Sequence, residues 1–136
     1  MALDRIRRNS TGRIVILDTS AIFMVFEYSV DLEQELTRLL GSFDIIVPAA
    51  VVEEIQKLFE YGSGKKKQLA KMSLQFIKRY TSKEIGHGDM VDDLVISAAK
   101  ELQGIVVTND KELRKRLKSQ RIRQIFLRQK QYLMME

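Results

Sequence analysis

Acidic side chains recur along this chain next to short apolar segments, and their spacing is the first indication of chemistry. They are Asp18, Glu53, Glu54, Asp92, Asp93 and Asp110. Carboxylates gathered in a poorly hydrated cleft repel one another, and a bound divalent cation relieves that repulsion. Such an ion can activate water and neutralise the negative charge that develops on a phosphodiester during cleavage. We therefore expect metal-dependent chemistry on a phosphate ester.

The residue types that are missing narrow the choice of metal. The sequence has no cysteine and a single histidine, His87. This composition excludes thiolate sites and multi-histidine zinc cages. Hard oxygen ligands favour Mg²⁺ or Mn²⁺, and we expect one or two such ions.

Helical spacing helps to choose within each acidic pair. Glu54 borders an apolar stripe of its predicted helix, whereas Glu53 has polar neighbours. Asp92 shares a helix face with Val95, while Asp93 lies toward the more polar side. We favour Glu54 and Asp92 as the inward-facing residues and keep Asp93 as an alternative third ligand.

Alternating strands and helices must bring these acids together. Continuous apolar runs predict buried strands at residues 13–17, 44–47, 105–108 and 124–127. Helical spacing predicts helices from about residue 21 and at residues 31–40, 48–61, 65–80, 89–103 and 110–119. This alternation is typical of a three-layer α/β/α sandwich around a central, mainly parallel sheet. Sites in such folds lie beyond the carboxyl ends of strands, where Asp18 and Asp110 fall.

Length and charge bound the remaining possibilities. The chain has 136 residues, which suits one domain, and 23 Lys and Arg against 18 Asp and Glu give a net charge of +5. A positive balance favours an anionic partner. No apolar run is long enough for a bilayer, and the basic N-terminus lacks the apolar core of a secretion signal. We therefore expect a cytoplasmic protein with no membrane partner.

Four segments resemble the acidic motifs of PIN domains. They are residues 14–22 (IVILDTSAI), 47–55 (VPAAVVEEI), 91–99 (VDDLVISAA) and 105–110 (IVVTND). All four follow the order found in that family, and the resemblance covers residues 13 to 127. It implies a single PIN-like domain over residues 1–136, with a flexible basic arm at residues 1–12 and a tail at residues 128–136.

PIN domains are metal-dependent ribonucleases, most of which cut single-stranded RNA. The resemblance implies that four carboxylates hold one or two Mg²⁺ or Mn²⁺ ions and form the catalytic centre: Asp18, Glu54, Asp92 and Asp110. It leaves the third position open between Asp92 and Asp93. Ser20 and Thr108 would support the carboxylates by hydrogen bonding. The implied products carry a 5′-phosphate and a 3′-hydroxyl.

The C-terminal half narrows the resemblance further. Residues 110–117 and 125–133 are similar to archaeal PIN proteins related to the rRNA-processing endonucleases of the small ribosomal subunit. This similarity implies an endoribonuclease of rRNA processing or ribosome assembly, acting on single-stranded or structured RNA such as an rRNA precursor. The alternatives are a VapC-type toxin with an antitoxin partner, and a non-catalytic RNA-binding scaffold. PIN domains also often form homodimers, so the resemblance implies that this chain could form one.

Two basic blocks near the acidic motifs are candidates for RNA binding. They comprise Lys65, Lys66, Lys67, Arg114, Lys115 and Lys118. Either block could instead be a solvated helix face. We favour contact with the RNA backbone, because an acidic centre repels RNA unless nearby cations offset its charge.

Overall fold

A computed structural model describes residues 13–136, so the predicted arm at residues 1–12 lies outside the described residues. The strands are β1 (Arg13–Leu17), β2 (Phe43–Pro48), β3 (Thr81–Lys83), β4 (Ile105–Val107), β5 (Gln124–Arg128) and β6 (Tyr132–Met135). The helices are α2 (Thr19–Glu27), α3 (Leu32–Leu40), α4 (Ala49–Tyr61), α5 (Gly64–Phe76), η1 (Ile77–Arg79), α6 (Val91–Leu102) and α7 (Lys111–Ser119). Within residues 13–136, no helix is both long and apolar enough to cross a bilayer.

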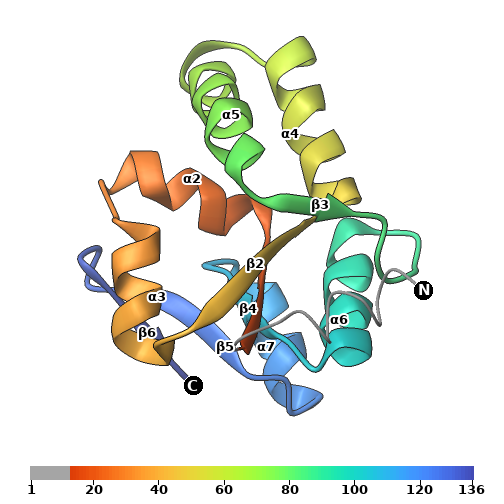
Figure 1. Ribbon diagram of the computed structural model, residues 1–136. Helices are drawn as coiled ribbons and strands as arrows, with labels where there is room; N and C mark the ends of the chain where they lie inside the picture. Colours follow the sequence, from red (N-terminus) through yellow and green to blue (C-terminus); the bar gives the residue numbers. More distant parts are fainter. Residues whose placement is uncertain (1–12) are drawn as a thin grey trace.

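The strands form one sheet in the order β3-β2-β1-β4-β5-β6. All neighbouring pairs are parallel except β5 with β6. Helices α2 and α3 lie on one side of this sheet, and α6 and α7 lie on the other (Figure 1). The predicted three-layer α/β/α sandwich with a mainly parallel sheet is thereby confirmed. Because five strands run the same way, their carboxyl ends meet at one edge.

The apolar run that predicted β1 fills the centre of the core. Residues 14–17 are at most 1% exposed, as expected for a strand with partners on both sides and helices on both faces. Burial of each such side chain contributes about 1.5–3 kcal/mol. The residue that follows β1 is therefore held at a rigid point of the fold.

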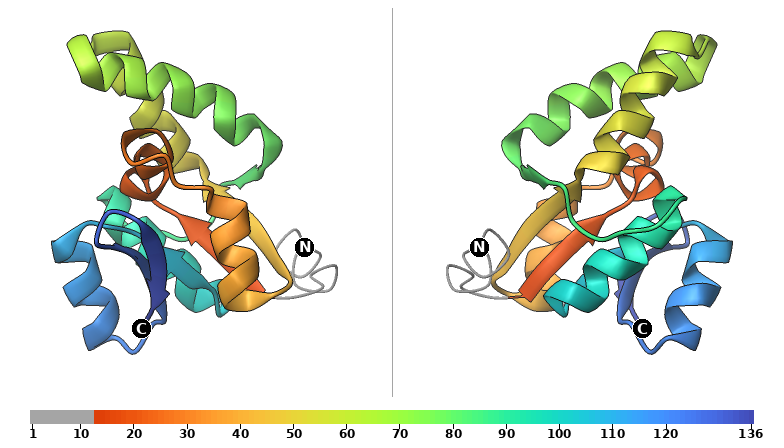
Figure 2. Two further views of the ribbon diagram at one scale, coloured as in Figure 1. Left: turned by 90° about the vertical axis from the view of Figure 1, so that its left-hand side faces the viewer. Right: turned by 90° about the vertical axis from the view of Figure 1, so that its right-hand side faces the viewer.

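Helices α4 and α5 form a hairpin that projects beyond the carboxyl edge of the sheet (Figure 2). The hairpin is anchored where α5 packs against α2, with the Phe26 and Phe76 rings edge to face at 5.7 Å between centroids. The Phe76 ring also meets that of Tyr80 at 5.6 Å. This anchor sets one wall of the carboxyl edge.

The structure corrects the predicted elements in two respects at the margins of the sheet. Strand β3 was not predicted, because all three of its residues are exposed and carry no apolar signal. The predicted tail at residues 128–136 contains β6, which pairs antiparallel with β5. Only Leu133 of β6 is fully buried, so a short apolar segment at a sheet edge was mistaken for a tail.

Helix boundaries also differ from the prediction: the helix expected from about residue 21 is α2, which begins at Thr19. The helix expected at residues 65–80 is α5, which ends at Phe76 and continues as the short η1. The helix expected at residues 89–103 is α6, which begins at Val91. Met90 is extended and its N–H donates to the Asp93 carboxylate, so the chain enters the helix later than its acidic residues suggested.

Candidate functional site

Asp18 lies at the N-cap of α2, directly after the central strand, and is only 6% exposed. Its carboxylate accepts hydrogen bonds from the Ala21 N–H at 2.8 Å, from the Ser20 hydroxyl at 2.8 Å and from the Thr108 hydroxyl. Burial, with a smaller contribution from the charge of Asp92, raises the pKa of Asp18 to about 6, even though these hydrogen bonds lower it. Asp18 is thus a desolvated carboxylate held in one orientation.

Ser20 and Thr108 join the ends of β1 and β4. The fully buried Thr108 donates to Asp18 and accepts from the Asp110 N–H at 3.1 Å. Ser20 donates to Asp18 and accepts from the Asn109 N–H at 2.9 Å. The two hydroxyls lie 3.2 Å apart. This network fixes the backbone at residues 108–110 relative to the Asp18 carboxylate.

A pocket of about 290 Å³ opens at this edge of the sheet. It is lined by four carboxylates, Asp18, Glu54, Asp92 and Asp110, together with Thr19, Ser20, Phe23, Leu58, Lys66 and Val91. The acids come from the N-caps of α2 and α7, from the interior of α4 and from the first turn of α6. Four separate elements therefore bring together acids that are far apart in the sequence.

Two of these acids show how the pocket is organised electrostatically. Glu54 accepts a hydrogen bond from the Thr19 hydroxyl, which follows Asp18 on α2. Burial raises the pKa of Asp92, and repulsion from Asp110 and Glu54 raises it further, while Arg116 opposes the rise. The pocket thus holds surplus negative charge that its own hydrogen bonds only partly offset.

Asp93 has partners of a different kind. Its carboxylate accepts from Arg116 at 2.7 Å and from the Met90 N–H at 3.3 Å. The bond from Arg116 and then that from Met90 lower the pKa of Asp93. Asp93 is absent from the lining of the pocket. The structure therefore gives Asp93 a role in starting α6 and joining it to α7.

The donor set of the pocket fits a hard divalent cation. It offers only oxygen ligands, two of its acids have raised pKa values, and their mutual repulsion would be relieved by positive charge. Among the residues described here, no group of three acids is close enough to form a ready-made cage. An ion held by these carboxylates would complete its shell with water or substrate oxygens, as Mg²⁺ usually does.

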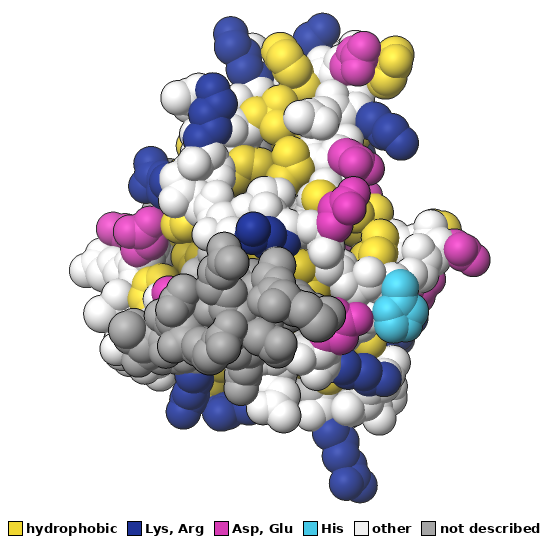
Figure 3. All heavy atoms as spheres, turned by 45° about the vertical axis from the view of Figure 1, so that its right-hand side comes forward, with side chains coloured by type: hydrophobic (Ala, Val, Ile, Leu, Met, Phe, Trp, Pro, Cys, Tyr) yellow, Lys and Arg dark blue, Asp and Glu magenta, His cyan; other side chains and the backbone are white. Residues whose placement is uncertain are grey.

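The basic block at the start of α5 lies beside this pocket. Figure 3 shows Lys and Arg side chains at the free end of the α4–α5 hairpin. Lys66 lines the acidic pocket itself. Lys67 lies over the Phe59 ring, with its Nζ 5.8 Å from the ring centroid, and Lys65 is exposed. Of this block, Lys66 is the cation placed to meet a ligand of the carboxylates.

The basic block on α7 is engaged elsewhere. Arg114 donates to Gln124 at 2.7 Å and stacks on Phe126, with 3.6 Å from its Cζ to the ring centroid. Lys118 pairs with Glu136 at 3.5 Å, and Lys115 pairs with Glu112 at 3.9 Å. None of these three cations lines the acidic pocket. Arg114 fastens α7 to β5, which is a structural role.

Three residues of the site were missed by sequence reasoning. Thr19 holds Glu54, and Arg116 holds Asp93. Asn109 accepts from the Leu127 N–H at 2.8 Å and so ties the loop before Asp110 to β5. Thr19 and Asn109 could have been found from the sequence, because each is adjacent to a predicted acid, Asp18 or Asp110. Arg116 could not, because its partner Asp93 is far away in the sequence.

Comparisons with known proteins agree on one family. A family profile described as "PIN like domain" matches residues 15–130. Ribonuclease VapC4 of Methanocaldococcus jannaschii is 30% identical over 122 residues, which cover 87% of this chain and 92% of that protein. Ribonuclease VapC9 of Archaeoglobus fulgidus is 30% identical over 115 residues, covering 85% of this chain and 83% of that protein.

Solved structures show the same fold at lower identity. The PIN domain endonuclease Utp24 superposes with a TM-score of 0.74 at 22% identity, over 90% of each chain. A chain of the VapBC2 complex from Rickettsia felis gives a TM-score of 0.57 at 21% identity, over 76% of this chain and 92% of that one. With the family profile and the two relatives, these findings confirm the predicted resemblance: the chain belongs to the PIN domain family.

Proposed function

We propose that this protein is a metal-dependent endoribonuclease that hydrolyses phosphodiester bonds in RNA. The observation that carries the proposal is the convergence of four carboxylates in one pocket, beside a lysine, at the carboxyl edge of the sheet. Two relatives that align over most of this chain are named ribonucleases, which supports RNA as the substrate.

In this proposal, the cation is held by Asp18, Glu54, Asp92 and Asp110. When bound, Mg²⁺ or Mn²⁺ would supply positive charge that stabilises the phosphodiester as negative charge develops on it. Ser20 and Thr108 keep the Asp18 carboxylate in its orientation. A carboxylate of the pocket would accept the proton of the attacking water.

Lys66 fits contact with the RNA backbone at the same pocket. An acidic centre repels a phosphodiester, and a lysine at its wall offsets part of that repulsion. We assign the close contact to Lys66, with Lys65 and Lys67 contributing to the field around the hairpin. Arg114 is assigned to packing, since its guanidinium already has partners on β5.

The test is cleavage of an unstructured RNA by the purified protein. We expect cleavage with Mn²⁺ or Mg²⁺, none in EDTA, and products with 5′-phosphate and 3′-hydroxyl ends. Titration of Mn²⁺ by calorimetry separates this proposal from a non-catalytic scaffold. Cleavage that persists equally in EDTA, or the absence of Mn²⁺ binding, would refute the proposed enzyme.

Between the two biological roles, the relatives favour a toxin of the VapC type. Both ribonucleases carry that name and align over more than four fifths of their own length. An antitoxin would then be the protein partner of this chain.

Expression in cells tests this role. It is supported if expression arrests growth and if co-expression of a neighbouring gene relieves the arrest. Accumulation of unprocessed rRNA in a deletion strain would instead support rRNA processing. The expected homodimer stays a prediction.

A further inference from the structure

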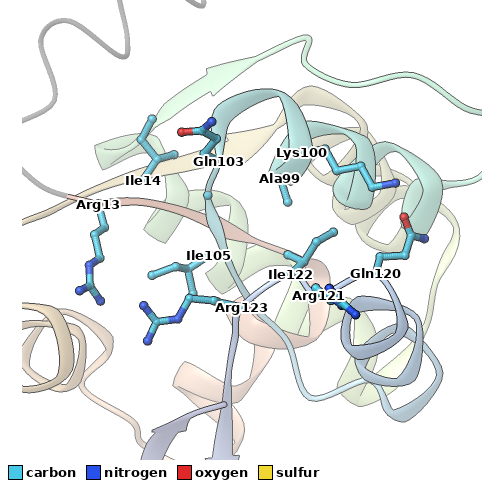
Figure 4. Close-up of a pocket in the computed structure, with 11 residues that line it drawn as sticks. Arg13, Ile14, Ala99, Lys100, Gln103, Ile105, Gln120, Arg121, Ile122 and Arg123 are labelled. Carbon is cyan, nitrogen blue, oxygen red and sulfur yellow. The ribbon is translucent and has the colours of Figure 1, made fainter.

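A second opening lies at the opposite, amino edge of the sheet, away from the carboxylates. It has a volume of about 550 Å³ and is formed where β1, β4 and β5 begin and where α6 and α7 end. Figure 4 shows the side chains that surround it. We propose that this opening binds phosphate groups of the RNA strand whose scissile bond lies in the acidic pocket. This inference rests on the proposed ribonuclease function and extends it to a second contact.

Strand register explains the opening. Val15 of β1 lies opposite Ile105, and Gln124 of β5 lies opposite Val106, so Arg123 is level with Ile105. Strand β1 starts two residues earlier, at Arg13. Strand β4 is therefore shorter than β1 at this edge, which leaves a notch between Arg13 and Arg123.

Gly104 lies in the lining of the notch, between the end of α6 and the start of β4. A Cβ added at Gly104 would lie 3.2 Å from the Ile14 carbonyl oxygen and 3.2 Å from the Ile16 Cδ1 atom. The glycine therefore lets the end of α6 approach β1 closely.

Charge on these walls has one sign. Among the residues that the structure describes, Arg13, Lys100, Arg121 and Arg123 line the opening, and no acid does. All four are exposed, and within residues 13–136 none of them forms an ion pair. In Figure 4 the guanidinium groups of Arg13 and Arg123 extend in a similar direction. Arginine forks match phosphate oxygens in geometry, so the ligand that fits is a phosphate-bearing polyanion.

These cations are not needed to close the two helix ends. At α6 the Gly104 N–H donates to the Ala99 carbonyl at 2.9 Å. At α7 the Ile122 N–H donates to the Leu117 carbonyl at 3.0 Å. Both helices thus end in turns in which backbone amides satisfy the terminal carbonyls. A helix-capping role therefore does not account for the arginine side chains.

Arg121 is the most informative of the four. Its φ of 58° is left-handed, a conformation in which glycine is favoured over any residue with a side chain. Arginine at this position disfavours the fold relative to glycine, yet it adds a cation to the opening.

The two sites are far enough apart to define the ligand further. Asp18 follows Arg13 by five residues along a strand, a separation of roughly 16 Å at about 3.3 Å per residue. One small phosphate ester cannot occupy both edges. An RNA strand that continues past the scissile bond is long enough to contact both, so under the proposed function the same strand makes the second contact.

The experiment measures binding of a fluorescein-labelled, unstructured 30-nucleotide RNA in EDTA, where cleavage does not interfere. The double variant Arg121→Gly/Arg123→Gln is compared with Lys78→Gln/Lys83→Gln, which removes two exposed charges outside the opening. We expect the arginine variant to bind about tenfold more weakly and to reduce the slope of log K against log salt by about 1.4, the value for two lost contacts to single-stranded RNA. Arg121→Gly alone should keep or raise the melting temperature.

Three results would overturn the inference. Affinity and salt slope equal to those of the lysine control would show that the opening does not contact RNA. Loss of thermal stability in Arg121→Gly would show that the side chain serves the fold. Weakened binding of polyglutamate with unchanged RNA binding would assign the opening to an acidic protein segment.

If the wild type binds and cuts RNA but the arginine variant binds RNA as the lysine control does, this inference alone fails. If the wild type neither binds nor cuts RNA, the proposed function fails with it.

Discussion

Replacing Asp18 by asparagine should stabilise the metal-free protein, although it removes a proposed metal ligand. The carboxyl group is 6% exposed, and burial raises its pKa from 3.8 to about 6. The folded protein therefore holds this proton more tightly than the unfolded chain does. Between about pH 4 and pH 6 the folded state binds more protons, so the free energy of unfolding falls as pH rises through this window.

The magnitude follows from the two pKa values. At about 1.4 kcal/mol for each pKa unit, ionisation of Asp18 lowers the free energy of unfolding by about 3 kcal/mol by pH 7. Asparagine keeps the N-cap acceptor for the Ala21 N–H but accepts less well from the Ser20 and Thr108 hydroxyls, which we set at about 1 kcal/mol. The net gain for Asp18→Asn in EDTA at pH 7 is about 2 kcal/mol. For a chain of this length that gain raises the melting temperature by roughly 6 °C.

The assay is urea denaturation of both proteins in EDTA at pH 4.5 and pH 7. The advantage of Asp18→Asn should be present at pH 7 and should shrink toward pH 4.5, where wild-type Asp18 is protonated. Adding Mn²⁺ at pH 7 should stabilise the wild type and have little effect on the variant. A variant that is less stable than the wild type by the same amount at both pH values would refute the proposed desolvation of Asp18.

Other contacts of the site give three further predictions. Thr108→Val should lower the free energy of unfolding by about 1–3 kcal/mol, because the Asp110 N–H and Asp18 both lose a partner; an unchanged urea midpoint would contradict this. Lys66→Gln should weaken binding of single-stranded RNA in EDTA and reduce its salt slope by about 0.7, and an unchanged slope would remove Lys66 from the RNA contact. Arg116→Gln should raise the pKa of Asp93 toward its ordinary value, measured by NMR titration; a pKa that stays low would mean that the Met90 N–H alone holds it.

Local signals were sufficient to predict the centre of the fold. Residues 14–17 are apolar without interruption, and such a short β-branched run is typical of a strand covered on both faces. Asp18 and Asp110 could be located because each follows a strand of this kind and caps the next helix. These positions depend on the chain within a few residues of each acid.

Positions that depend on distant packing could not be predicted. Strand β3 pairs with β2 at the edge of the sheet and has no apolar residue. The partner of Arg114 lies ten residues away on β5, and nothing in the spacing of α7 indicates it. Lys66 lines the acidic pocket because the packing of the α4–α5 hairpin brings the start of α5 to it. No local pattern in the sequence of α5 indicates this contact.

Adjacent residues Asp92 and Asp93 provide the most direct test of the central claim, that the pocket carboxylates form a metal-dependent catalytic centre. Asp92 lines the pocket, whereas Asp93 is bound by Arg116 and the Met90 N–H. The measurement is the single-turnover rate of RNA cleavage with Mn²⁺ for Asp92→Asn and Asp93→Asn, two changes of identical chemistry. For Asp92→Asn we predict that the rate falls by about 100-fold or more, as for removal of a group that acts in the transition state. For Asp93→Asn we predict a rate within about threefold of the wild type, because the asparagine amide oxygen can still accept from the Met90 N–H. Equal losses in both variants, or a larger loss for Asp93→Asn, would contradict the account.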